Sequence, residues 1–381
     1  MPLSSAWILK SHTSCSKYDL PRRILLVTGT LAGGGTEKQV YYTAAALVGQ
    51  GVEVKVVSLH DGGVWQHRIE SDLKLEVEVI PRTHSLIRLM YLRRIVKRFQ
   101  PHVVHTFHFY AGTYMVMLGL WMQVPVIVSL RTSLQVLRKR SSWWERIFTF
   151  MRAHAIVANS WSVIGEMKRA IWRMVLHKLH YLPNTIDINA VPQALRYDGV
   201  EPFMMFFAGS ISHGKNVPLF LDVIKTLHQM GYKVRAVIIG DGRSLGDVIT
   251  YVEQLKISEI VEFHGRVDDV RSMLRRAHAF FFPSIYEGMP NVVMEAVAEG
   301  VPVISSRVGD VPKLIKDGYS GFLFDPENKL EAYEKSRRLI EEYNQIAPKM
   351  VQRAFRYLQS HYSFDQYPEQ LAALYRSIRS K

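Results

Sequence analysis

Two glutamates, Glu287 and Glu295, bracket a glycine, a proline and an asparagine in the segment YEGMPNVVMEA. On one continuous helix, residues eight apart lie about 12 Å apart along the axis, so the two carboxylates could not flank one bond. Gly288 favours a turn, and Pro290 suits the first position of a helix. We therefore expect Glu287 on a loop, Glu295 in the second helical turn, and between them a helix N-terminus that suits a phosphate. The alternative is two ordinary glutamates without a shared task.

A second glycine-rich segment, AGGGTEK, follows the apolar run RILLVTGTL and contains Gly34 and Gly35. Its glycines permit a tight turn and the close approach of a ligand to the backbone. The segment lacks the usual dinucleotide-binding pattern, and the next strand, VVSL, ends in leucine rather than in an acidic residue, which argues against a nicotinamide-dependent dehydrogenase. A flexible turn before a helix is the alternative.

Three more segments, AGSISHGKN, IIGDG and FHGRV, follow apolar runs in the second half of the chain. Lys215 stands at an expected helix start, where its ammonium group could meet a phosphate; the alternative is a solvated lysine. Gly240 and the pair Arg266 and Val267 lie in loops whose backbone groups could hold a nucleotide base.

His105 and His108 lie at the end of the expected strand segment PHVVHTFHF and are candidate catalytic residues, although a histidine of this kind is often a polar residue with satisfied hydrogen bonds. No cluster of His, Cys and Asp has the spacing of metal ligands, and no Gly-x-Ser-x-Gly segment is present. The sequence therefore predicts no metal site and no serine nucleophile of that type.

Strands and helices alternate along the whole chain and position these loops. In the first half, RILLVTGTL, VEVKVVSL, PHVVHTF, VPVIVSL and AHAIVANS read as strands; in the second half, FMMFFAG, KVRAVIIGDG, IVEFHG, HAFFFPS and VPVISSRVG do so. Helical segments separate them, so we expect two doubly wound α/β domains with parallel sheets and a linker near 185–200. Ligands of such sheets bind at the carboxyl ends of the strands, where every segment above falls. In a two-domain chain, this predicts a cleft between facing strand ends.

The chain has 381 residues and a formal net charge of +14, which is concentrated in the first half. Residues 1–190 hold 24 Lys and Arg against 11 Asp and Glu, whereas residues 191–381 hold 24 against 23. This asymmetry indicates an anionic partner for the first half, either nucleic acid, a membrane or a phosphorylated ligand. The single cysteine, Cys15, fits a reducing compartment, and residues 1–20, which lack the order of a signal peptide, are expected to form a mobile tail.

No acidic residue occurs between Glu78 and Glu145, and within this interval SLIRLMYLRRIVKRF predicts an amphipathic basic helix. The segment LRKRSSWWERIF then places Trp143 and Trp144 beside Arg138, Lys139 and Arg140. Both features favour docking on an anionic membrane, with a solvated basic face as the alternative. The uncharged run 109–130 is long enough to span a bilayer, but its internal proline and β-branched end favour a buried helix followed by a strand.

Taken together, AGSISHGKN, IIGDG, VEFHGRVDDV and the long segment from HAFFFPSIYEGMP to GYSGFLF resemble the donor domain of retaining family 4 glycosyltransferases, also called group 1. AGGGTEKQV, PHVVHTF and LPNTID resemble the first half of the same enzymes. The resemblance covers about 22–365 and implies the GT-B fold. It implies an N-terminal acceptor-side domain at 21–190, a nucleotide-sugar domain at 191–365, and a C-terminal helix at 366–381 that packs back on the N-terminal domain.

The resemblance also implies roles for individual residues. Glu295 would bind the ribose hydroxyls, Glu287 would face the donor sugar, and Lys215 would neutralise the diphosphate as it leaves, without a metal ion. Catalytic candidates are Glu287, Lys215, Arg131, His105 and His108. Donor-binding candidates are Gly34, Gly35, Gly209, Ser210, Lys215, Gly240, Arg266, Val267, Glu287, Gly288, Met289, Pro290, Asn291, Val292 and Glu295.

Three positions depart from the family pattern. Ser210 stands where the family usually has an arginine that contacts the diphosphate, Lys313 replaces a common glutamate, and Arg131 stands where a histidine is often found. Arg131 could supply part of the positive charge that is missing at Ser210. If it does not, catalysis is weakened.

The resemblance predicts a retaining glycosyltransferase that uses a UDP- or GDP-linked sugar and needs no cofactor. Its acceptor would be a lipid-linked or cell-surface glycan precursor at the cytoplasmic face of the plasma membrane, where the protein is expected to be peripheral. Two other functions stay open: a non-catalytic nucleotide-sugar or glycan-binding relative, and a sugar-nucleotide epimerase, which would leave the basic first half unexplained. Nucleic-acid binding is not expected, because no recognition motif accompanies the charge.

Overall fold

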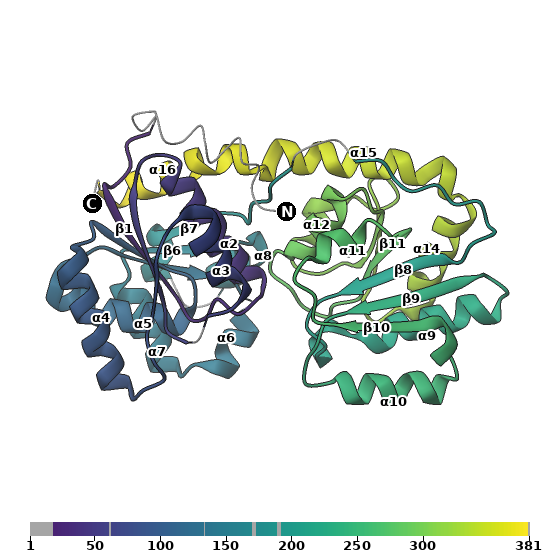
Figure 1. The fold of residues 1–381 in the computed structure, drawn as a ribbon, viewed down its shortest axis with the longest axis horizontal. Helices are drawn as coiled ribbons and strands as arrows, with labels where there is room; N and C mark the ends of the chain where they lie inside the picture. Colours follow the sequence, from purple (N-terminus) through teal and green to yellow (C-terminus); the bar gives the residue numbers. More distant parts are fainter. Residues whose placement is uncertain (1–17, 61, 133, 170–172, 189–191, 380–381) are drawn as a thin grey trace. The chain divides into compact units, whose positions relative to one another are not determined.

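A computed structural model describes residues 18–60, 62–132, 134–169, 173–188 and 192–379 (Figure 1). The chain forms two compact units: the first comprises Met1–Asp187 and Tyr362–Lys381, and the second Ile188–His361. Of the expected N-terminal tail at 1–20, residues 1–17, with Cys15, lie outside the described residues.

The described part of the first unit is built on a parallel sheet. Its strands are β1 (Arg23–Thr28), β2 (Glu53–Ser58), β3 (Val77–Val79), β4 (Val103–Thr106), β5 (Val126–Leu130), β6 (Ala155–Ala158) and β7 (Leu179–Tyr181), in the order β3-β2-β1-β4-β5-β6-β7. Each neighbouring pair is parallel. The apolar strands β1, β4, β5 and β6 are buried on both faces, as expected for strands that helices cover on both sides.

Helices cover both faces of this sheet. They are α2 (Gly35–Val48), α3 (Val64–Leu73), α4 (Ser85–Phe99), α5 (Phe109–Met122), α6 (Leu134–Arg140), α7 (Trp143–Arg152), α8 (Trp161–Arg169) and α16 (Tyr367–Arg379). Ile24 and Leu26 of β1 pack in one core with α2, α3 and α16, whereas Leu25 and Val27 pack in the other with α4 to α8. The alternation follows from the two-residue period of a strand.

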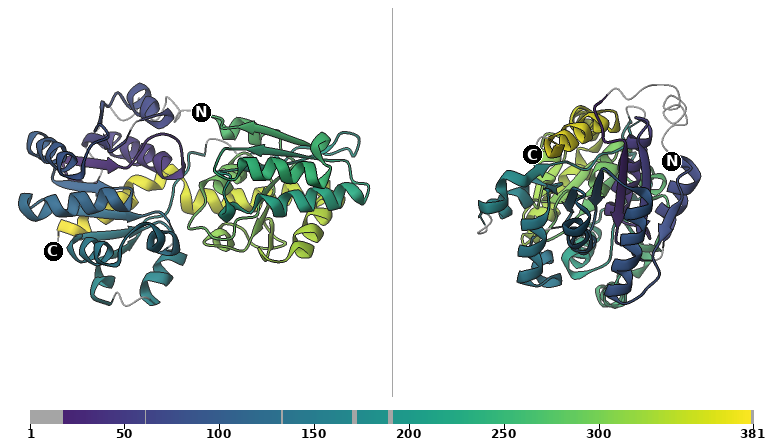
Figure 2. Two further views of the ribbon diagram at one scale, coloured as in Figure 1. Left: turned by 90° about the horizontal axis from the view of Figure 1, so that it is seen from below. Right: turned by 90° about the vertical axis from the view of Figure 1, so that its left-hand side faces the viewer.

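The C-terminal helix α16 belongs to the first unit, although it is the last element of the chain. Tyr367, Leu371 and Tyr375 of α16 are fully buried in the core that contains α2 and β1. Figures 1 and 2 show this helix in yellow against the purple and blue elements of the same unit. The hydroxyl groups of Tyr367 and Thr43 are 3.0 Å apart, which adds a polar contact between α16 and α2.

The second unit repeats the architecture with a six-stranded parallel sheet in the order β10-β9-β8-β11-β12-β13. The strands are β8 (Phe203–Ala208), β9 (Val234–Ile239), β10 (Val261–Gly265), β11 (Ala279–Phe282), β12 (Val303–Ser306) and β13 (Phe322–Phe324). The helices are α9 (Val217–Gln229), α10 (Leu245–Leu255), α11 (Val270–Leu274), α12 (Asn291–Ala298), α13 (Val311–Leu314), α14 (Lys329–Glu341) and α15 (Tyr343–Tyr362), whose last residue belongs to the first unit. The expected α/β class with two doubly wound parallel sheets is therefore confirmed.

Each sheet has a switch point, where successive connections leave in opposite directions and open a crevice at the carboxyl edge. In the first sheet the switch point lies between β1 and β4, and in the second between β8 and β11. The loops that follow these four strands contain most of the residues that the sequence singles out.

The uncharged run 109–130 forms α5, a short turn and β5, as the sequence predicts. In the described part of the chain, no helix combines the length and the apolar character that crossing a bilayer requires.

Candidate functional site

The carboxyl edge of the second sheet brings together the loops after β8 and β11. Lys215 follows β8 and Glu287 follows β11, so the two residues lie on opposite sides of the switch point. Lys215 Nζ donates a hydrogen bond to Glu287 Oε1, and both side chains are mostly buried. The ammonium group also lies 5.2 Å from the centre of the Phe282 ring, in cation–π range. The two expected ligand contacts are thus held as one ion pair.

Backbone contacts fix the two loops to each other. Ile285 N donates to Gly214 O at 2.9 Å. A Cβ on Gly214 would lie 2.5 Å from the hydroxyl of Tyr286, so the ring of Tyr286 packs closely over this glycine. The position of Glu287 relative to Lys215 is therefore set by main-chain geometry as well as by charge.

The glycines after β8 and β9 also lie together. Gly240 has φ +141°, and a Cβ there would stand 1.9 Å from Gly209 O. Gly209 N donates to Ile239 O at 3.0 Å, and Gly240 N to Gly265 O at 2.7 Å. The close approach shows that Gly240 is required for the packing of neighbouring strand ends, and φ +153° favours glycine at position 209. Their predicted contact with a ligand stays a prediction.

The second glutamate, Glu295, lies in the second turn of α12 and is buried. The helix begins at Asn291 and Pro290 is its N-cap, so the expectation that Pro290 is the first helical residue is wrong by one position. The extended conformation of Pro290, with ψ 117°, places it just outside the helix. Gly288 O accepts from Asp310 N at 2.8 Å, which anchors the loop before the helix to the turn after β12.

The remaining donor-binding candidates surround this edge. Ser210 and Arg266 are exposed in the loops after β8 and β10, beside the partly exposed Val267. Met289 is buried before α12, and Val292 is partly exposed in its first turn.

At the switch point of the first sheet, a histidine and a glutamate lie close together, and the N-terminus of α2 is nearby. Gly34 is the N-cap of α2 and Gly35 its first residue. His108, which follows β4, accepts from Gly29 N through Nδ1 at 3.0 Å, and its Nε2 lies 3.9 Å from Glu37 Oε1. A Cβ on Gly34 would stand 2.6 Å from Glu37 Oε2, so Gly34 and His108 are neighbours of the same carboxylate, which no sequence motif singled out.

His105 is wrongly expected at the end of its strand. It lies inside β4, is fully buried, and its ring nitrogens lie 2.9 Å from Tyr375 Oη and from Ser129 Oγ. Both nitrogens thus have partners within the core, and His105 connects β4 to β5 and α16. The continuous apolar pattern of a doubly covered strand concealed which way this side chain points.

Both histidines are held neutral. Burial, and then the charge of Arg131, lowers the pKa of His105 from 6.5 to about 3. The same two causes, followed by Arg140 and His60, lower the pKa of His108 to about 4. His108 is therefore a neutral imidazole that can accept a hydrogen bond, and it does not supply positive charge.

Arg131 directly follows β5, at the same edge of the first sheet. Its Nη1 donates to Asn184 Oδ1 at 2.8 Å, and Asn159 Nδ2 donates to the same oxygen at 3.0 Å. The guanidinium carbon lies 5.0 Å from the centre of the Phe107 ring. Asn159 immediately follows β6, which is the signal that sequence reasoning missed: a polar residue at the carboxyl end of a strand.

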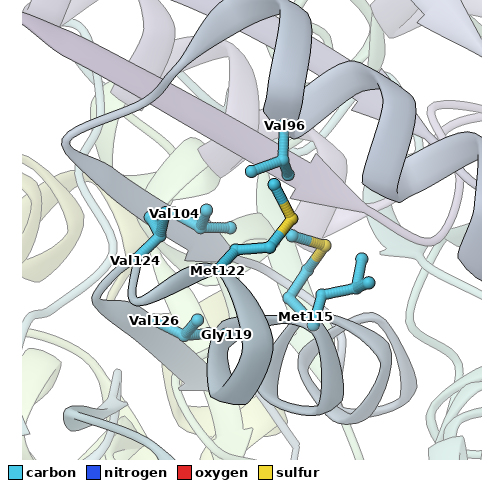
Figure 3. Close-up of a pocket in the computed structure, with 8 residues that line it drawn as sticks. Val96, Val104, Met115, Gly119, Met122, Val124 and Val126 are labelled. Carbon is cyan, nitrogen blue, oxygen red and sulfur yellow. The ribbon is translucent and has the colours of Figure 1, made fainter.

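An apolar crevice in the first unit is unrelated to these sites (Figure 3). It is lined by Val96, Val104, Met115, Leu118, Gly119, Met122, Val124 and Val126, and it is too small for a water molecule. None of these side chains can do acid–base or ionic chemistry. In the described residues, no group of three or more His, Cys, Asp or Glu is arranged to hold a metal ion.

Two family models match the chain, one in each half. Residues 198–356 match the family model "Glycosyl transferases group 1", and residues 33–190 match "Glycosyltransferase Family 4". A Campylobacter jejuni relative, GalNAc-alpha-(1->4)-GalNAc-alpha-(1->3)-diNAcBac-PP-undecaprenol alpha-1,4-N-acetyl-D-galactosaminyltransferase, is 24% identical over 337 residues, which are 84% of this chain and 90% of the relative. An uncharacterized glycosyltransferase of Methanocaldococcus jannaschii is 31% identical over 172 residues, 42% of this chain and 47% of that protein.

Among solved structures, the Anabaena protein HepE in complex with UDP and glucose has a TM-score of 0.82 and 18% sequence identity. The match covers 93% of this chain and 100% of HepE. At this identity the likeness shows the fold, and the GT-B class expected from the sequence is confirmed.

Proposed function

The chain belongs to the group 1 glycosyltransferases, and we propose that it transfers a sugar from a nucleotide-diphosphate sugar to a glycan or lipid-linked acceptor, with retention of the anomeric configuration. The observation that carries this proposal is the Lys215–Glu287 pair across the switch point of the second sheet. UDP and glucose in the HepE complex, and the undecaprenol diphosphate in the name of the Campylobacter relative, support the two substrate classes.

In the reaction, the bond between the anomeric carbon and the diphosphate oxygen breaks. The acceptor hydroxyl forms the new bond on the same face of the sugar and gives its proton to the departing diphosphate oxygen, and the nucleoside diphosphate leaves. Lys215 Nζ stabilises the negative charge that develops on the leaving oxygen, which is the largest electrostatic demand of the step. Because a lysine supplies this charge, we propose that no metal ion is required.

The two glutamates act at different ends of the donor. Glu287 faces the sugar, and Glu295 accepts hydrogen bonds from the ribose hydroxyls. The backbone of Gly288–Asn291 at the start of α12 contacts the sugar hydroxyls. Because Lys215 is ion-paired with Glu287, the diphosphate of the donor competes with the Glu287 carboxylate for the Lys215 ammonium group.

The acceptor side follows from the surface of the first unit. Helix α4 packs against α5, and α5 packs against α7. These three helices carry large exposed apolar side chains: Leu86, Ile87, Met90, Tyr91, Met117, Leu120, Trp121, Trp143, Trp144 and Met151. Figure 1 shows the helices α4, α5 and α7 on one side of the first sheet. Exposed basic residues accompany them on α4, namely Arg93, Arg94, Lys97 and Arg98.

Apolar anchors among basic residues fit the interface of an anionic membrane, where aromatic rings insert and each basic residue contributes about 1 kcal/mol. We propose that this surface brings the enzyme to a lipid-linked acceptor at the cytoplasmic face of the membrane. The net charge of the first half is then explained without nucleic acid.

The transfer activity is tested by incubating the purified protein with UDP- and GDP-linked sugars and lipid-linked acceptors. Product formation and release of nucleoside diphosphate are followed with and without a chelator. Activity that survives the chelator supports the proposal. Binding of nucleotide sugars without any transfer would favour a non-catalytic relative, and interconversion of the nucleotide sugar without an acceptor would favour an epimerase.

Membrane docking is tested by co-sedimentation with vesicles of increasing anionic lipid content. Binding is expected to rise with anionic lipid, to fall with salt, and to weaken in Leu86→Ser. Leu330→Ser is the matched control, because Leu330 in the second unit is 64% exposed and Leu86 is 76% exposed. Equal binding of all three proteins, whatever the lipid, would contradict docking through this surface.

A further inference from the structure

Arg131 has unused hydrogen-bonding capacity at the carboxyl edge of the first sheet. Its Nη1 donates to Asn184 Oδ1. Burial lowers the pKa of Arg131, and a contact with the hydroxyl group of Tyr367 opposes this effect. Nε and Nη2 are buried and make no hydrogen bond of normal length among the described residues. Nor does any described carboxylate form an ion pair with this guanidinium. A buried cation without a counter-charge is costly, so this arrangement suits a negative group that arrives with a ligand.

The two unused donors form a fork. Nε–H and the nearer N–H of Nη2 point along one edge of the planar guanidinium and match two oxygens of a single carboxylate or phosphate. The hydrogen bond of Nη1 to Asn184 fixes the orientation of that edge. Asn184 Oδ1 also accepts from Asn159, which holds the acceptor itself in place.

Asn159 adds a second requirement for the ligand. Its side chain is only 3% exposed, and its Oδ1 has no hydrogen-bond partner among the described residues. This oxygen can accept a hydrogen bond from a hydroxyl group, whereas it repels the unprotonated oxygens of a phosphate. The cluster of Arg131, Asn159 and Asn184 therefore suits a ligand that carries both a negative group and a neighbouring hydroxyl group.

The single positive charge of this cluster favours a ligand group with one negative charge over a group with several. Arg131 is its single cation, because His105 and His108 are kept neutral by burial and by Arg131 itself. One guanidinium balances a carboxylate, whereas a diphosphate or terminal phosphate carries more charge than one buried cation can neutralise.

We propose that Arg131, Asn159 and Asn184 recognise the carboxylate of an acidic sugar, a hexuronate. Arg131 donates to both carboxylate oxygens through Nε and Nη2, and Asn159 Oδ1 accepts from a neighbouring ring hydroxyl. This inference rests on the proposed glycosyltransferase function and narrows its substrate class. The hexuronate belongs either to the donor or to the acceptor, and the experiment separates the two sources.

The test uses charge-matched pairs with the full chain. The donor pairs are UDP-glucuronate with UDP-glucose, UDP-galacturonate with UDP-galactose, and GDP-mannuronate with GDP-mannose. The acceptor pair is methyl glucuronide with methyl glucoside, each added with UDP. In at least one pair, calorimetry should show the acidic member binding about tenfold to a hundredfold tighter, the range for a charge-assisted hydrogen-bond pair. Equal affinities in every pair would overturn the inference.

Failure of this inference is distinct from failure of the proposed function. If neutral nucleotide sugars bind and are transferred without any preference for an acid, the glycosyltransferase function is supported and the hexuronate site is contradicted. If no nucleotide sugar binds, the proposed function falls. The methyl glucuronide pair needs no turnover, so its outcome then decides the hexuronate site alone.

Variants separate recognition from a structural role. Arg131→Gln should bring the ratio of the affinities for the acidic and the neutral ligand close to one, whereas Arg152→Gln, at an exposed arginine at the end of α7, should leave this ratio unchanged. Asn159→Asp places a carboxylate close to the guanidinium, so it should abolish the preference for the acid. If Arg131→Gln lowers the melting temperature and weakens acidic and neutral ligands alike, Arg131 is structural and the proposal is wrong.

Discussion

The carboxyl edges of the two sheets differ in whether their cation has an acidic partner. At the edge of the second sheet, Lys215 is neutralised by Glu287, and the loops that carry them are joined through backbone hydrogen bonds. At the edge of the first sheet, the neighbours of Arg131 are neutral: two asparagines, the hydroxyl group of Tyr367, and histidines whose pKa is lowered by burial and by the charge of Arg131.

This difference concerns what an incoming anion must displace. A phosphate that binds Lys215 competes with a carboxylate that the protein already provides, so binding there exchanges one ion pair for another. An anion that meets Arg131 has no such competitor among the described residues, and it relieves the cost of a buried cation. The edge of the first sheet is therefore expected to select ligands by their charge. At the edge of the second sheet, the charge of Lys215 is expected to act in catalysis.

The largest effect is expected from Lys215→Ala, which removes a preorganised positive charge from the leaving diphosphate. Turnover should fall by about 100-fold or more, as is typical when one such donor is lost. Lys329→Ala is the control, because Lys329 is also ion-paired in the second unit, with Asp222 at 3.2 Å. Steady-state kinetics of both variants make the comparison.

Full activity in Lys215→Ala would show that the charge at the second edge is structural. Ser210→Arg extends the test, because Ser210 is exposed in the same loop after β8. An added positive charge there should leave turnover unchanged or raise it. A marked fall would contradict the proposed position of the diphosphate.

The next effect distinguishes the two glutamates. Glu295→Ala should weaken nucleotide-sugar affinity by about 1.5–3 kcal/mol, since the ribose loses hydrogen bonds to a carboxylate. Glu287→Ala should lower turnover more than affinity, because its loss disturbs the sugar and leaves Lys215 without its partner. Calorimetry and kinetics together separate these outcomes, and equal behaviour of the two variants would refute the division of roles.

The fold could be predicted because both sheets consist of continuous apolar strands separated by glycine-rich loops and helices. Such a pattern specifies burial on both faces and the edge at which the loops meet. It also located Lys215 and Glu287 at that edge. Their ion pair could not be predicted, since residues 72 apart in sequence meet only through the order of β8 and β11.

The same pattern explains the error at His105. A strand that is covered on both faces lacks the alternation of polar and apolar residues that shows which side chains point outward. His105 therefore looked like a strand-end residue, whereas its nitrogens meet Ser129 and Tyr375 in the core. The partner in α16 lies 270 residues away, beyond the reach of any local pattern.

A smaller effect concerns the stability of the second edge. Gly240→Ala should destabilise the protein by about 2 kcal/mol, because a Cβ there would stand 1.9 Å from Gly209 O at a positive φ. Gly246→Ala is the matched control: it lies in α10 with nothing within 4 Å of the added Cβ, and should stabilise by about 0.5–1 kcal/mol. Urea unfolding followed by circular dichroism measures both, and equal effects would refute the close approach.

The smallest effect is a pH dependence of the first edge. His105 has a pKa of about 3 in the folded protein against 6.5 when exposed, so the unfolded chain binds the proton more readily. The resulting stability is complete above pH 6.5 and is lost as the pH falls toward 3. Between pH 7 and 5.5 the loss from this residue should be about 1 kcal/mol.

Tryptophan fluorescence can follow this change, because all seven tryptophans lie in the segment 1–187 of the first unit. Denaturant unfolding at pH 7 and 5.5 should show a smaller loss of stability in His105→Gln than in the unchanged protein. His84→Gln, at an exposed histidine before α4, should retain the full loss. If His105→Gln keeps the full loss as well, the buried neutral histidine is not what makes the first edge sensitive to acid, and the contrast with the ion-paired second edge would have to rest on Arg131 alone.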